Sequence, residues 1–524
     1  MACHLSDELK LQVQNLVRIG AALSSERDID VLLEMIVEES RRFTSADGGT
    51  LYVVSDDEQY LDWKILHNDT MGTRMGGTSG IPIHLPPVPL HVDGAPNRGN
   101  VSAACANTGE PINIPDAYEA DGYDFSGTRQ YDESSGYRSK SFLVVPLRNH
   151  EDDIIGILQL INAQDPASGE TIAFSEAAQE LVIALGSQAA VAITNARLIS
   201  DLSLLFDAFI QATATAIDEK SPYTAGHVRR VADLTMQIAG AINRSDADRW
   251  QDTKFSADEL EELRVAAWMH DVGKITTPEH VVDKSTKLET IHDRIELVAA
   301  RMEIVKRDRI IRVLSQGLSN DERTSRLAGI DSTLAALEQD LAFIRECNLG
   351  GEFMSDEQID RLNSLSEQVV EIAGSSQAVI SEDELLNLSI RKGTLTEEER
   401  QVIQNHAAVT LKILLQLPFS KGLRNVPEYA GGHHEKLNGH GYPSGLTADE
   451  LPLQARILAV ADVFEALTAP DRPYRAPMPL AKAMDLLDIM VDEGDLDGEI
   501  VDLFKQSGVF MVYAQKELGA EQYE

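Results

Sequence analysis

One long helical pattern constrains the fold of this chain more than any other feature of its sequence. From Ser175 to about Ala216 the apolar residues keep helical spacing, and Gly186 is almost the only residue there that disfavours a helix. We expect this helix to leave one domain and enter the next, since 524 residues can form two or three domains with sizeable cores. The predicted division is a first domain at residues 1–198, a linker helix at 199–216 and a second domain at 217–524.

The parts of the chain before and after this helix differ in their secondary-structure pattern. Residues 8–42 show helical periodicity, and "GGTLYVVSD" at 48–56 is typical of a strand. The stretch "SFLVVPLRNHEDDIIGILQLINAQ" at 141–164 predicts a hairpin of two apolar strands around a polar turn at 149–153. After Ala216 the pattern is helical throughout. The predicted fold class is therefore α+β and multidomain, with a mixed first domain and an all-α second domain.

A segment at about 289–392, inside the second domain, has an apolar pattern of its own. Its apolar residues repeat at alternating steps of four and three on both sides of the polar run "SQGLSNDERT": Ile291, Ile295, Val298, Met302 and Val305, then Leu327, Ile330, Leu334, Leu337, Leu341 and Ile344. This heptad pattern predicts two helices packed as an antiparallel hairpin. A third helix is expected to begin at Ser355, in a capping-box pattern, and to carry Ile359, Leu362, Leu365 and Val369. We interpret the segment as a helical insertion for spacing or interaction, without chemistry.

The composition excludes several classes of partner. The chain has 46 basic and 85 acidic residues, a formal net charge of −39, which would repel a nucleic-acid polymer or an anionic membrane. Cys3, Cys105 and Cys347 are scattered and odd in number, as expected in a reducing cytosol. The longest apolar runs have strand length, and the N-terminus does not have the pattern of a signal peptide. We therefore expect a cytoplasmic protein.

The stretch "AAWMHDVGKITTPEH" at 266–280 places a histidine and an aspartate at the end of an apolar helix that Gly273 terminates. Buried charge needs partners, so His270 and Asp271 must meet either protein groups or metal ions. One histidine alone is more often structural than a ligand, so the prediction of a metal site depends on several candidate ligands together. Further imidazoles and one carboxylate in an apolar helix complete it: His227, His406, His433, His434 and Asp462.

A mixture of imidazoles and carboxylates suits divalent iron, manganese, zinc or nickel better than calcium, which binds through oxygen alone. An aspartate next to a histidine can bridge two ions, because its two oxygens can bind different metals. Two such ions can acidify a water and stabilise charge on an attacked phosphoryl group. Lys274, one helical turn after Asp271, could reach a phosphate oxygen or the leaving group.

The motifs "HDVGK", "HHEKLNGHGYPSGL" and "ADVFEALTAPDRPYR" resemble the HD-GYP domain, a branch of the HD phosphohydrolases, over about 217–288 and 393–490. The resemblance implies a helical bundle with a di- or trinuclear metal centre that hydrolyses cyclic di-GMP to pGpG and GMP. It implies metal binding by His227, His270, Asp271, His406, His433, His434 and Asp462, with Asp271 as the bridging and catalytic ligand. It further implies phosphate contact by Lys274, and substrate binding by Arg472, Arg475 and the loop Gly441, Tyr442 and Pro443.

The chain departs from the HD-GYP pattern in four places. The family has a short connection from its HD motif to its third ligand histidine, whereas here His270 and His406 lie 136 positions apart. Members with three metals have a glutamate four residues before the first histidine, where this chain has Tyr223, so we expect two ions, iron or manganese. Lys436 and Asn438 replace an arginine and an aspartate, which bears on substrate preference. "TAPDRPYR" is one residue longer than usual, which loosens the alignment of Arg472 and Arg475.

The stretch "NIPDAYEADGYDFSGTRQYDESSGYRSKSFLVVPLRNHEDDIIGILQLINA" resembles the GAF domains of cyclic-nucleotide phosphodiesterases and cyclases, over about 15–198. The resemblance implies an antiparallel sheet flanked by helices, with a small-molecule pocket on one face. Cyclic-nucleotide-binding members have an NKFDE signature, which Asn162, Phe174 and Glu176 match in part, while Ala163 and Ser175 replace the lysine and aspartate. A cyclic nucleotide, another small ligand and a purely structural role in dimerisation stay open for this domain.

The sequence thus predicts a GAF sensor joined by a long helix to an HD-GYP phosphodiesterase, with homodimerisation through that helix. One alternative is a nucleotide-responsive signalling scaffold with little or no catalysis, whose insertion recruits partners. Another is a hydrolase of a different cyclic dinucleotide.

Overall fold

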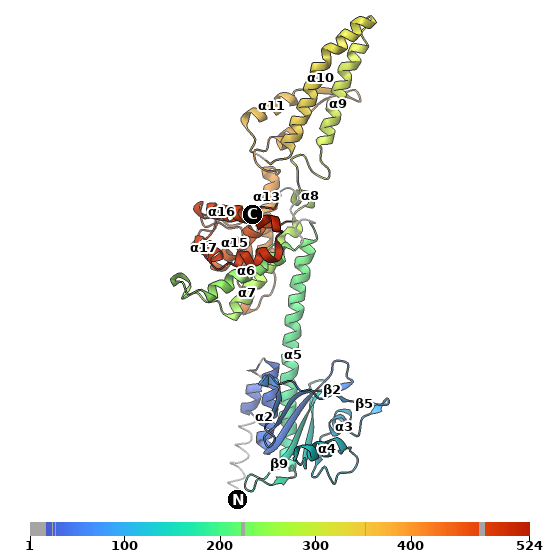
Figure 1. Cartoon of the computed structure of the whole chain (residues 1–524), viewed down its shortest axis with the longest axis vertical. Coiled ribbons are helices and arrows are strands. Elements are labelled where there is room, and N and C mark those ends of the chain that lie inside the picture. The colour runs from blue at the N-terminus through green and yellow to red at the C-terminus, as the bar shows by residue number, and fades with distance from the viewer. Residues whose placement is uncertain are drawn as a thin grey trace. The chain divides into compact units, whose positions relative to one another are not determined.

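The computed structural model describes residues 17–23, 25–26, 28–221, 226–351, 353–470 and 477–523. The chain divides into two compact units, residues 1–206 and residues 207–524 (Figure 1). The two predicted fold types are confirmed, an antiparallel sheet with helices in the first unit and a helical second unit.

The first unit is built on an antiparallel sheet with strand order β3-β2-β1-β9-β8-β7. These strands are β1 (Ala46–Val54), β2 (Tyr60–Asn68), β3 (Thr73–Gly76), β7 (Ile112–Ile114), β8 (Phe142–Arg148) and β9 (Ile154–Gln164). Two-residue strands extend it, since β4 (Val88–Pro89) pairs with β2 and β10 (Thr171–Ile172) pairs with β9. The hairpin predicted at 141–164 is confirmed as β8 and β9, joined at 149–153.

Alternating side chains give this sheet two apolar faces. Leu51 of β1 pairs with Ile65 and Leu158 on the neighbouring strands, and all three pack against α2 (Ile29–Thr44) and the start of α5 (Glu176–Asp218). Tyr52, one residue on, points to the opposite face, as the period of two in a strand requires. There α3 (Val101–Thr108) closes a second cluster, and α4 (Ser126–Ser135) follows it in the chain (Figure 1).

The expected helix over 8–42 is not continuous. Helical residues occur before position 24, but α2 begins anew at Ile29. Asp28 is its N-cap, and the Asp28 carboxylate accepts hydrogen bonds from the N–H groups of Asp30 and Val31. A side chain that satisfies these donors favours a helix start over continuation of the preceding helix.

The second unit contains a helical bundle around one apolar core. Its principal helices are α6 (His227–Arg244), α7 (Ala257–Met269), α13 (Glu397–Leu414), α14 (Val426–Gly431), α15 (Leu453–Thr468), α16 (Leu480–Asp492), α17 (Gly498–Gln506) and α18 (Val509–Glu517). The apolar face of α6 packs on α7 and α15, with Val231, Leu263 and Phe464 all inaccessible to solvent. A 3₁₀ turn, η3 (Val272–Thr276), and the short α8 (Glu279–Val282) follow α7.

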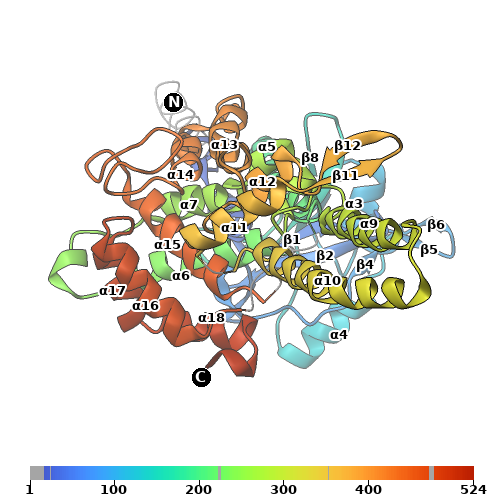
Figure 2. The ribbon, with the colours of Figure 1, turned by 90° about the horizontal axis from the view of Figure 1, so that it is seen from above.

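The segment at 289–392 has a core of its own within the second unit. Helices α9 (Ile295–Leu314) and α10 (Asn320–Asn348) form the expected hairpin and lie side by side in Figure 2. They pack with α11 (Asp356–Ser366) and α12 (Glu382–Leu388) around Val298, Ile344 and Leu362. The buried members of this cluster all come from residues 288–388, so the segment buries its apolar residues against itself.

Two details of the predicted segment are wrong. The third helix ends at Ser366, and Val369 instead begins a β-hairpin of β11 (Val369–Ile372) and β12 (Ser375–Ala378), where its side chain is 62% exposed. Ala373 and Gly374 both have positive φ, as a two-residue hairpin turn requires, and this local turn overrides the helical spacing. Ile291 precedes α9 and is 94% exposed rather than part of the seam.

Candidate metal centre

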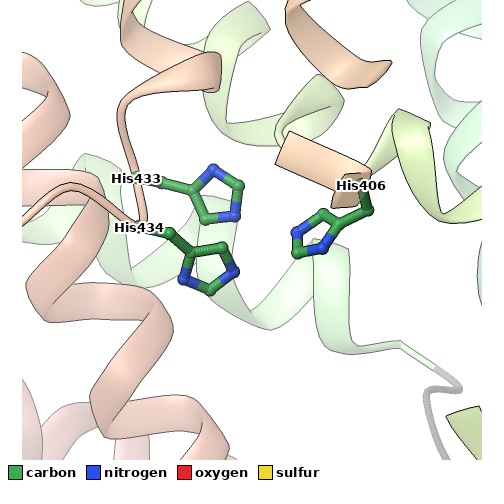
Figure 3. A group of neighbouring side chains, drawn as sticks. All are labelled: His406, His433 and His434. Atoms are coloured by element: carbon green, nitrogen blue, oxygen red, sulfur yellow. The ribbon is translucent and has the colours of Figure 1, made fainter. Parts of the chain in front are cut away.

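Seven side chains from five helical elements meet in the second unit. His227 is the first residue of α6, His270 and Asp271 follow α7, His406 lies in α13, His433 and His434 follow α14, and Asp462 lies in α15. The structure thus brings together all seven residues that the sequence predicts as metal ligands. Figure 3 shows His406 facing His433 and His434, and one ring nitrogen from each of the three lies within 4.8 Å of the other two.

Asp271 lies between two groups of imidazoles. Its Oδ1 is 3.3 Å from Nε2 of His406, while its Oδ2 is 3.3 Å from Nε2 of both His227 and His270. Asp462 faces the second group, with its Oδ1 3.3 Å from Nε2 of His227. The two oxygens of Asp271 therefore point toward different sets of nitrogens, which is the arrangement that a carboxylate bridging two ions requires.

The backbone fixes the orientation of three of these rings. Nδ1 of His270, His406 and His433 lies 2.7, 2.6 and 2.6 Å from a carbonyl oxygen three residues earlier, those of Ala267, Ile403 and Ala430. Each Nδ1 must carry the proton in such a bond, so each Nε2 presents a lone pair. All three Nε2 atoms and Oδ1 of Asp271 are buried and have no hydrogen-bond partner among the residues that the structure describes. Nitrogen and oxygen atoms that are buried together with free lone pairs and no hydrogen-bond partner are suited to bind a cation.

His227 is oriented by a carboxylate instead. Its Nδ1 is 2.5 Å from Oε2 of Glu465, a fully buried residue that also accepts a hydrogen bond from Nε of Arg230 at 2.7 Å. Glu465 stands three residues after Asp462, on the same face of α15. Sequence reasoning missed Glu465, although a second carboxylate at that spacing in an apolar helix was a usable signal.

Three of the imidazoles and the Asp271 carboxylate favour the protonation states that bind metal ions. Burial lowers the pKa of His406, lowers that of His433 well below its ordinary value, and lowers that of His434 to about 3. Burial would raise the pKa of Asp271, but Lys274 and the neighbouring imidazoles hold it well below the usual range. Neutral imidazoles and ionised carboxylates are the forms that bind metals.

His227 is the exception among the imidazoles. Burial lowers its pKa, yet the nearby carboxylates of Glu465, Asp271 and Asp462 outweigh burial and raise the pKa well above its ordinary value. The cluster of carboxylates therefore favours positive charge at this position. A divalent ion bound by His227 would supply that charge in place of a proton.

Lys274 and the turn that carries it lie against α13. Nζ of Lys274 is 2.5 Å from Oδ2 of Asp271. The N–H of Gly273 donates to Oγ1 of Thr410, and that hydroxyl donates to the carbonyl oxygen of His270, both at 2.9 Å. A Cβ at Gly273 would collide with the carbonyl oxygen of His406, so only glycine permits this close approach.

The loop with Gly441, Tyr442 and Pro443 borders the centre. The Tyr442 ring lies 4.7 Å from the ring of His434, and a Cβ at Gly441 would collide with the backbone of Glu435 and Lys436. Pro443 lines an adjacent groove of about 300 Å³. The buried Glu435 carboxylate accepts hydrogen bonds from the N–H groups of Ser444 and Leu446, which shapes the loop.

Lys436 and Asn438, the two residues that depart from the HD-GYP motif, anchor this loop. Nζ of Lys436 is 2.5 Å from Oδ2 of Asp495, and the Asn438 amide donates to Oδ1 of the same residue at 2.9 Å. Both side chains are thus bound to the segment before α17. Arg472, Arg475 and Tyr223 lie outside the described residues.

The three candidate ligand residues of the first unit lie apart from its main cavity. Asn162 is buried, and its Oδ1 accepts hydrogen bonds from the N–H groups of Lys140 and Ser141. Phe174 belongs to the apolar core, and Glu176 begins α5 at the surface. None of the three lines the cavity, so in the described structure they support the fold around Lys140 and α5.

That cavity has a volume of about 580 Å³, within the usual range for small-molecule sites. Its lining includes Trp63, His67, Tyr137 and Gln159, and contains no lysine, arginine, aspartate or glutamate among the described residues. Nδ1 of His67 bonds to Glu38 at 2.6 Å, while its buried Nε2 has no hydrogen-bond partner in the described part of the chain. Sequence reasoning expected a pocket on one sheet face but did not find these residues.

Comparison with known families agrees with the two folds. The GAF domain family matches residues 28–193, and the HD domain family matches residues 224–330 and again residues 377–500. Fold and site therefore define a protein in which a GAF domain precedes an HD domain. This chain thus contains the two kinds of domain that its motifs predicted, a GAF domain and a domain of the HD type.

Several curated relatives share the second unit. A 3'3'-cGAMP-specific phosphodiesterase 3 of Vibrio cholerae is 28% identical over 54% of this chain and 36% of its own length. A cyclic di-GMP phosphodiesterase of Thermotoga maritima is 32% identical over 24% of this chain and 37% of its own. A 3'3'-cGAMP-specific phosphodiesterase 1 of Vibrio cholerae is 42% identical over 22% and 25%. The chain thus spans about a quarter to a third of the length of these relatives.

Proposed function

We propose that this protein is a metal-dependent phosphodiesterase that hydrolyses cyclic di-GMP to pGpG, GMP or both. One observation carries the proposal: seven buried ligands converge, with unpartnered Nε2 atoms and a carboxylate that faces both groups of imidazoles. The names of the relatives support a cyclic dinucleotide as the substrate.

Two divalent ions, iron or manganese, held by the seven ligands would supply a Lewis acid at the phosphoryl group and acidify the attacking water. The remaining tasks fall to the chain. The carbonyl bonds at Nδ1 keep the rings of His270, His406 and His433 in one tautomer and one direction, so these three ligands are oriented before substrate binds. Thr410 joins the turn of Gly273 to α13 and so fixes the distance between Asp271 and His406.

Lys274 is proposed to exchange its ion pair with Asp271 for a phosphate oxygen of the substrate. Its Nζ already lies at the centre, and a lysine acts on phosphate as a mobile point charge. Tyr442, whose ring lies 4.7 Å from that of His434, is proposed to form the wall that a nucleobase or ribose contacts, with Gly441 and Pro443 as the rest of the loop. Arg472 and Arg475 are proposed as further phosphate ligands on sequence grounds.

A second candidate substrate is 3'3'-cGAMP, which the names of two relatives favour. Lys436 and Asn438 are the positions where this chain departs from its motif, and both are bound by Asp495. We therefore propose that they affect substrate choice through the shape of the loop rather than by direct contact.

The test is turnover by the full chain, purified without oxygen and supplied with Mn²⁺ or Fe²⁺. Cyclic di-GMP and 3'3'-cGAMP are compared as substrates, with products separated by chromatography and metal content measured on the same sample. His406→Ala should lose turnover and metal, while His292→Ala, an exposed histidine outside the site, should keep both. Binding without turnover by the wild type would favour the signalling scaffold, and faster turnover of 3'3'-cGAMP would reassign the substrate.

For the first unit we propose a sensor whose cavity takes a cyclic nucleotide or another small ligand, in a cytoplasmic homodimer. Support comes from the volume of the cavity and from the unpartnered Nε2 of His67. Thermal unfolding with cyclic GMP, cyclic AMP and neither ligand tests this proposal. A shift that His67→Leu removes would place the ligand at this cavity, and no shift with either nucleotide would exclude the two as ligands.

A further inference from the structure

Lys220 lies just beyond the end of α5 and binds the turn that carries Lys274. The helix ends at Asp218. Two residues later, the ammonium group of Lys220 donates hydrogen bonds to the carbonyl oxygens of Lys274 and Ile275, at 3.0 and 2.6 Å. Both acceptors belong to η3 and lie 54 and 55 positions after Lys220 in the chain. The side chain therefore joins the end of one helix to the backbone of a turn at the metal centre.

The two carbonyl groups lie in the second half of η3. The last carbonyl groups of a helix have no partner within that helix, and a lysine side chain can satisfy them. The carbonyl oxygen of Lys274 also accepts from the N–H of Thr277 at 3.0 Å, while the Ile275 side chain is 59% exposed and adds little apolar packing. The first half of the turn is tied to α13 through Gly273. Lys220 ties the second half.

The backbone on both sides of Lys220 is anchored within the second unit. Asp218 and Ser221 are both buried. Oδ2 of Asp218 accepts a hydrogen bond from the N–H of Gly226 at 3.1 Å, directly before α6. Oγ of Ser221 is 2.5 Å from Oδ1 of Asp283, directly after α8. A side chain that extends from a fixed backbone loses less entropy when it binds, so two bonds from Lys220 can hold the turn in place.

We propose that Lys220 is a positioning residue for hydrolysis, which holds the turn so that Nζ of Lys274 stays where the reacting phosphate binds. Two carbonyl oxygens already occupy the ammonium group of Lys220, so it acts through Lys274 and not on the substrate. This role rests on the proposed function, which assigns Lys274 to a phosphate oxygen. A preorganised charge stabilises the transition state more than the bound substrate, so its displacement lowers kcat rather than raising KM.

The test compares Lys220→Met, which removes the donors, with Lys220→Arg, which keeps charge and donors. Turnover of cyclic di-GMP and of bis(4-nitrophenyl) phosphate is measured with Mn²⁺. We expect kcat of Lys220→Met to fall about 10-fold or more, with KM and metal content within about twofold of the wild type. Lys220→Arg should restore kcat to within about threefold, because charge-assisted bonds to the carbonyl groups remain possible. Glu219→Ala, at the exposed neighbouring residue, is the control and should leave kcat unchanged.

A double variant shows whether Lys220 acts through Lys274. In a Lys274→Ala background, Lys220→Met should lower kcat by less than about twofold more, since residues that act as one unit are not additive. A full further loss of kcat in that background would overturn the proposal. So would a rise of KM with kcat unchanged, which would mean a direct contact with substrate, or a loss of metal, which would mean a general structural role.

Hydrogen exchange gives a measurement that does not depend on turnover. In the metal-loaded protein, the backbone amides of residues 274–277 should exchange about fivefold or more faster in Lys220→Met than in the wild type or Lys220→Arg, because the turn opens more often. Unchanged exchange would overturn the proposal, whether or not the wild type hydrolyses either substrate. Faster exchange in Lys220→Met beside a wild type that hydrolyses neither substrate would refute the proposed function and still support the hold of Lys220 on the turn.

Discussion

At the scale of single residues, the proposed chemistry depends on Asp271 more than on any other side chain. Its two oxygens face different imidazole groups, so Asp271→Ala would separate the two halves of the site. We expect this variant to lose at least 10-fold in metal affinity and to show no measurable hydrolysis, with unfolding of the GAF domain unchanged. Metal analysis, turnover and thermal unfolding check the three parts. Asp252→Ala, at an exposed carboxylate, is the control, and wild-type turnover by Asp271→Ala would move the active site elsewhere.

A buried lysine at the base of the insertion makes the stability of this segment depend on pH. Lys287 is 1% exposed, its Nζ donates to the carbonyl oxygen of Leu388, and burial lowers its pKa from 10.5 to about 8. The folded state therefore loses this proton at lower pH than the unfolded state, so the unfolded state binds more protons between about pH 8 and 10.5. Stability should rise with pH across that window, and the cost of burying the charge is fully present below pH 8.

Lys287→Met should remove this cost. We expect the insertion to gain about 1–3 kcal/mol at pH 7 and little at pH 10, because each pKa unit corresponds to 1.36 kcal/mol. Chemical denaturation at the two pH values, followed by hydrogen exchange in α10, measures the difference. Equal gains at both values would mean that packing rather than charge determines the effect.

The site could be predicted from the sequence to the extent that its ligands stand in local motifs. His270 with Asp271 and His433 with His434 are adjacent pairs, and Asp462 stands out as a charge in an apolar helix. Glu465 has the same signal, but its role depends on α6 lying against α15, a contact between residues 238 positions apart. The Asp495 contacts of Lys436 and Asn438 depend on tertiary packing in the same way.

At the scale of elements, the insertion should be removable. Its core is made from residues 288–388, and the base remains tied to the bundle by Lys284, whose Nζ lies 2.7 Å from Oε2 of Glu399 in α13. Replacing residues 292–390 with a short Gly-Ser linker should leave a folded, metal-loaded domain. Circular dichroism and metal content are the measurements, with Lys284→Met as a comparison that breaks the tie instead. A deletion variant that cannot fold would show that the insertion supports the bundle.

The elements were predictable where one local pattern dominated. The long helix, the β8–β9 hairpin and the α9–α10 hairpin follow from spacing alone. The β11–β12 hairpin could not be predicted from spacing. Leu362, Leu365 and Val369 are separated by helical steps, and the turn at Ala373-Gly374 is only two residues long. The break before α2 depends on the Asp28 side chain, a single cap within an otherwise helical pattern.

At the scale of the whole molecule, the net charge should shape the salt dependence of catalysis. A chain of charge −39 repels an anionic dinucleotide at long range, while Lys274 and bound metal ions attract it within the site. Salt screens the outer repulsion over a Debye length of about 8 Å but hardly affects partly buried contacts. Moderate salt should therefore lower the wild-type KM or leave it unchanged, and Lys274→Ala should lower turnover by roughly 10²-fold. A KM that rises steeply with salt would indicate an exposed basic docking surface.

The continuity of α5 has a consequence for how the two units could communicate. A helix advances about 1.5 Å and turns about 100° with each residue, so its length and its phase are coupled. Seven residues inserted near Ser200 lengthen α5 by about 10 Å but return it to within about 20° of its original phase. Two inserted residues add only about 3 Å and rotate one end by about 200°. If sensor and enzyme are coupled through rotation, the longer insertion should preserve the response of turnover to a GAF ligand and the shorter one should abolish it.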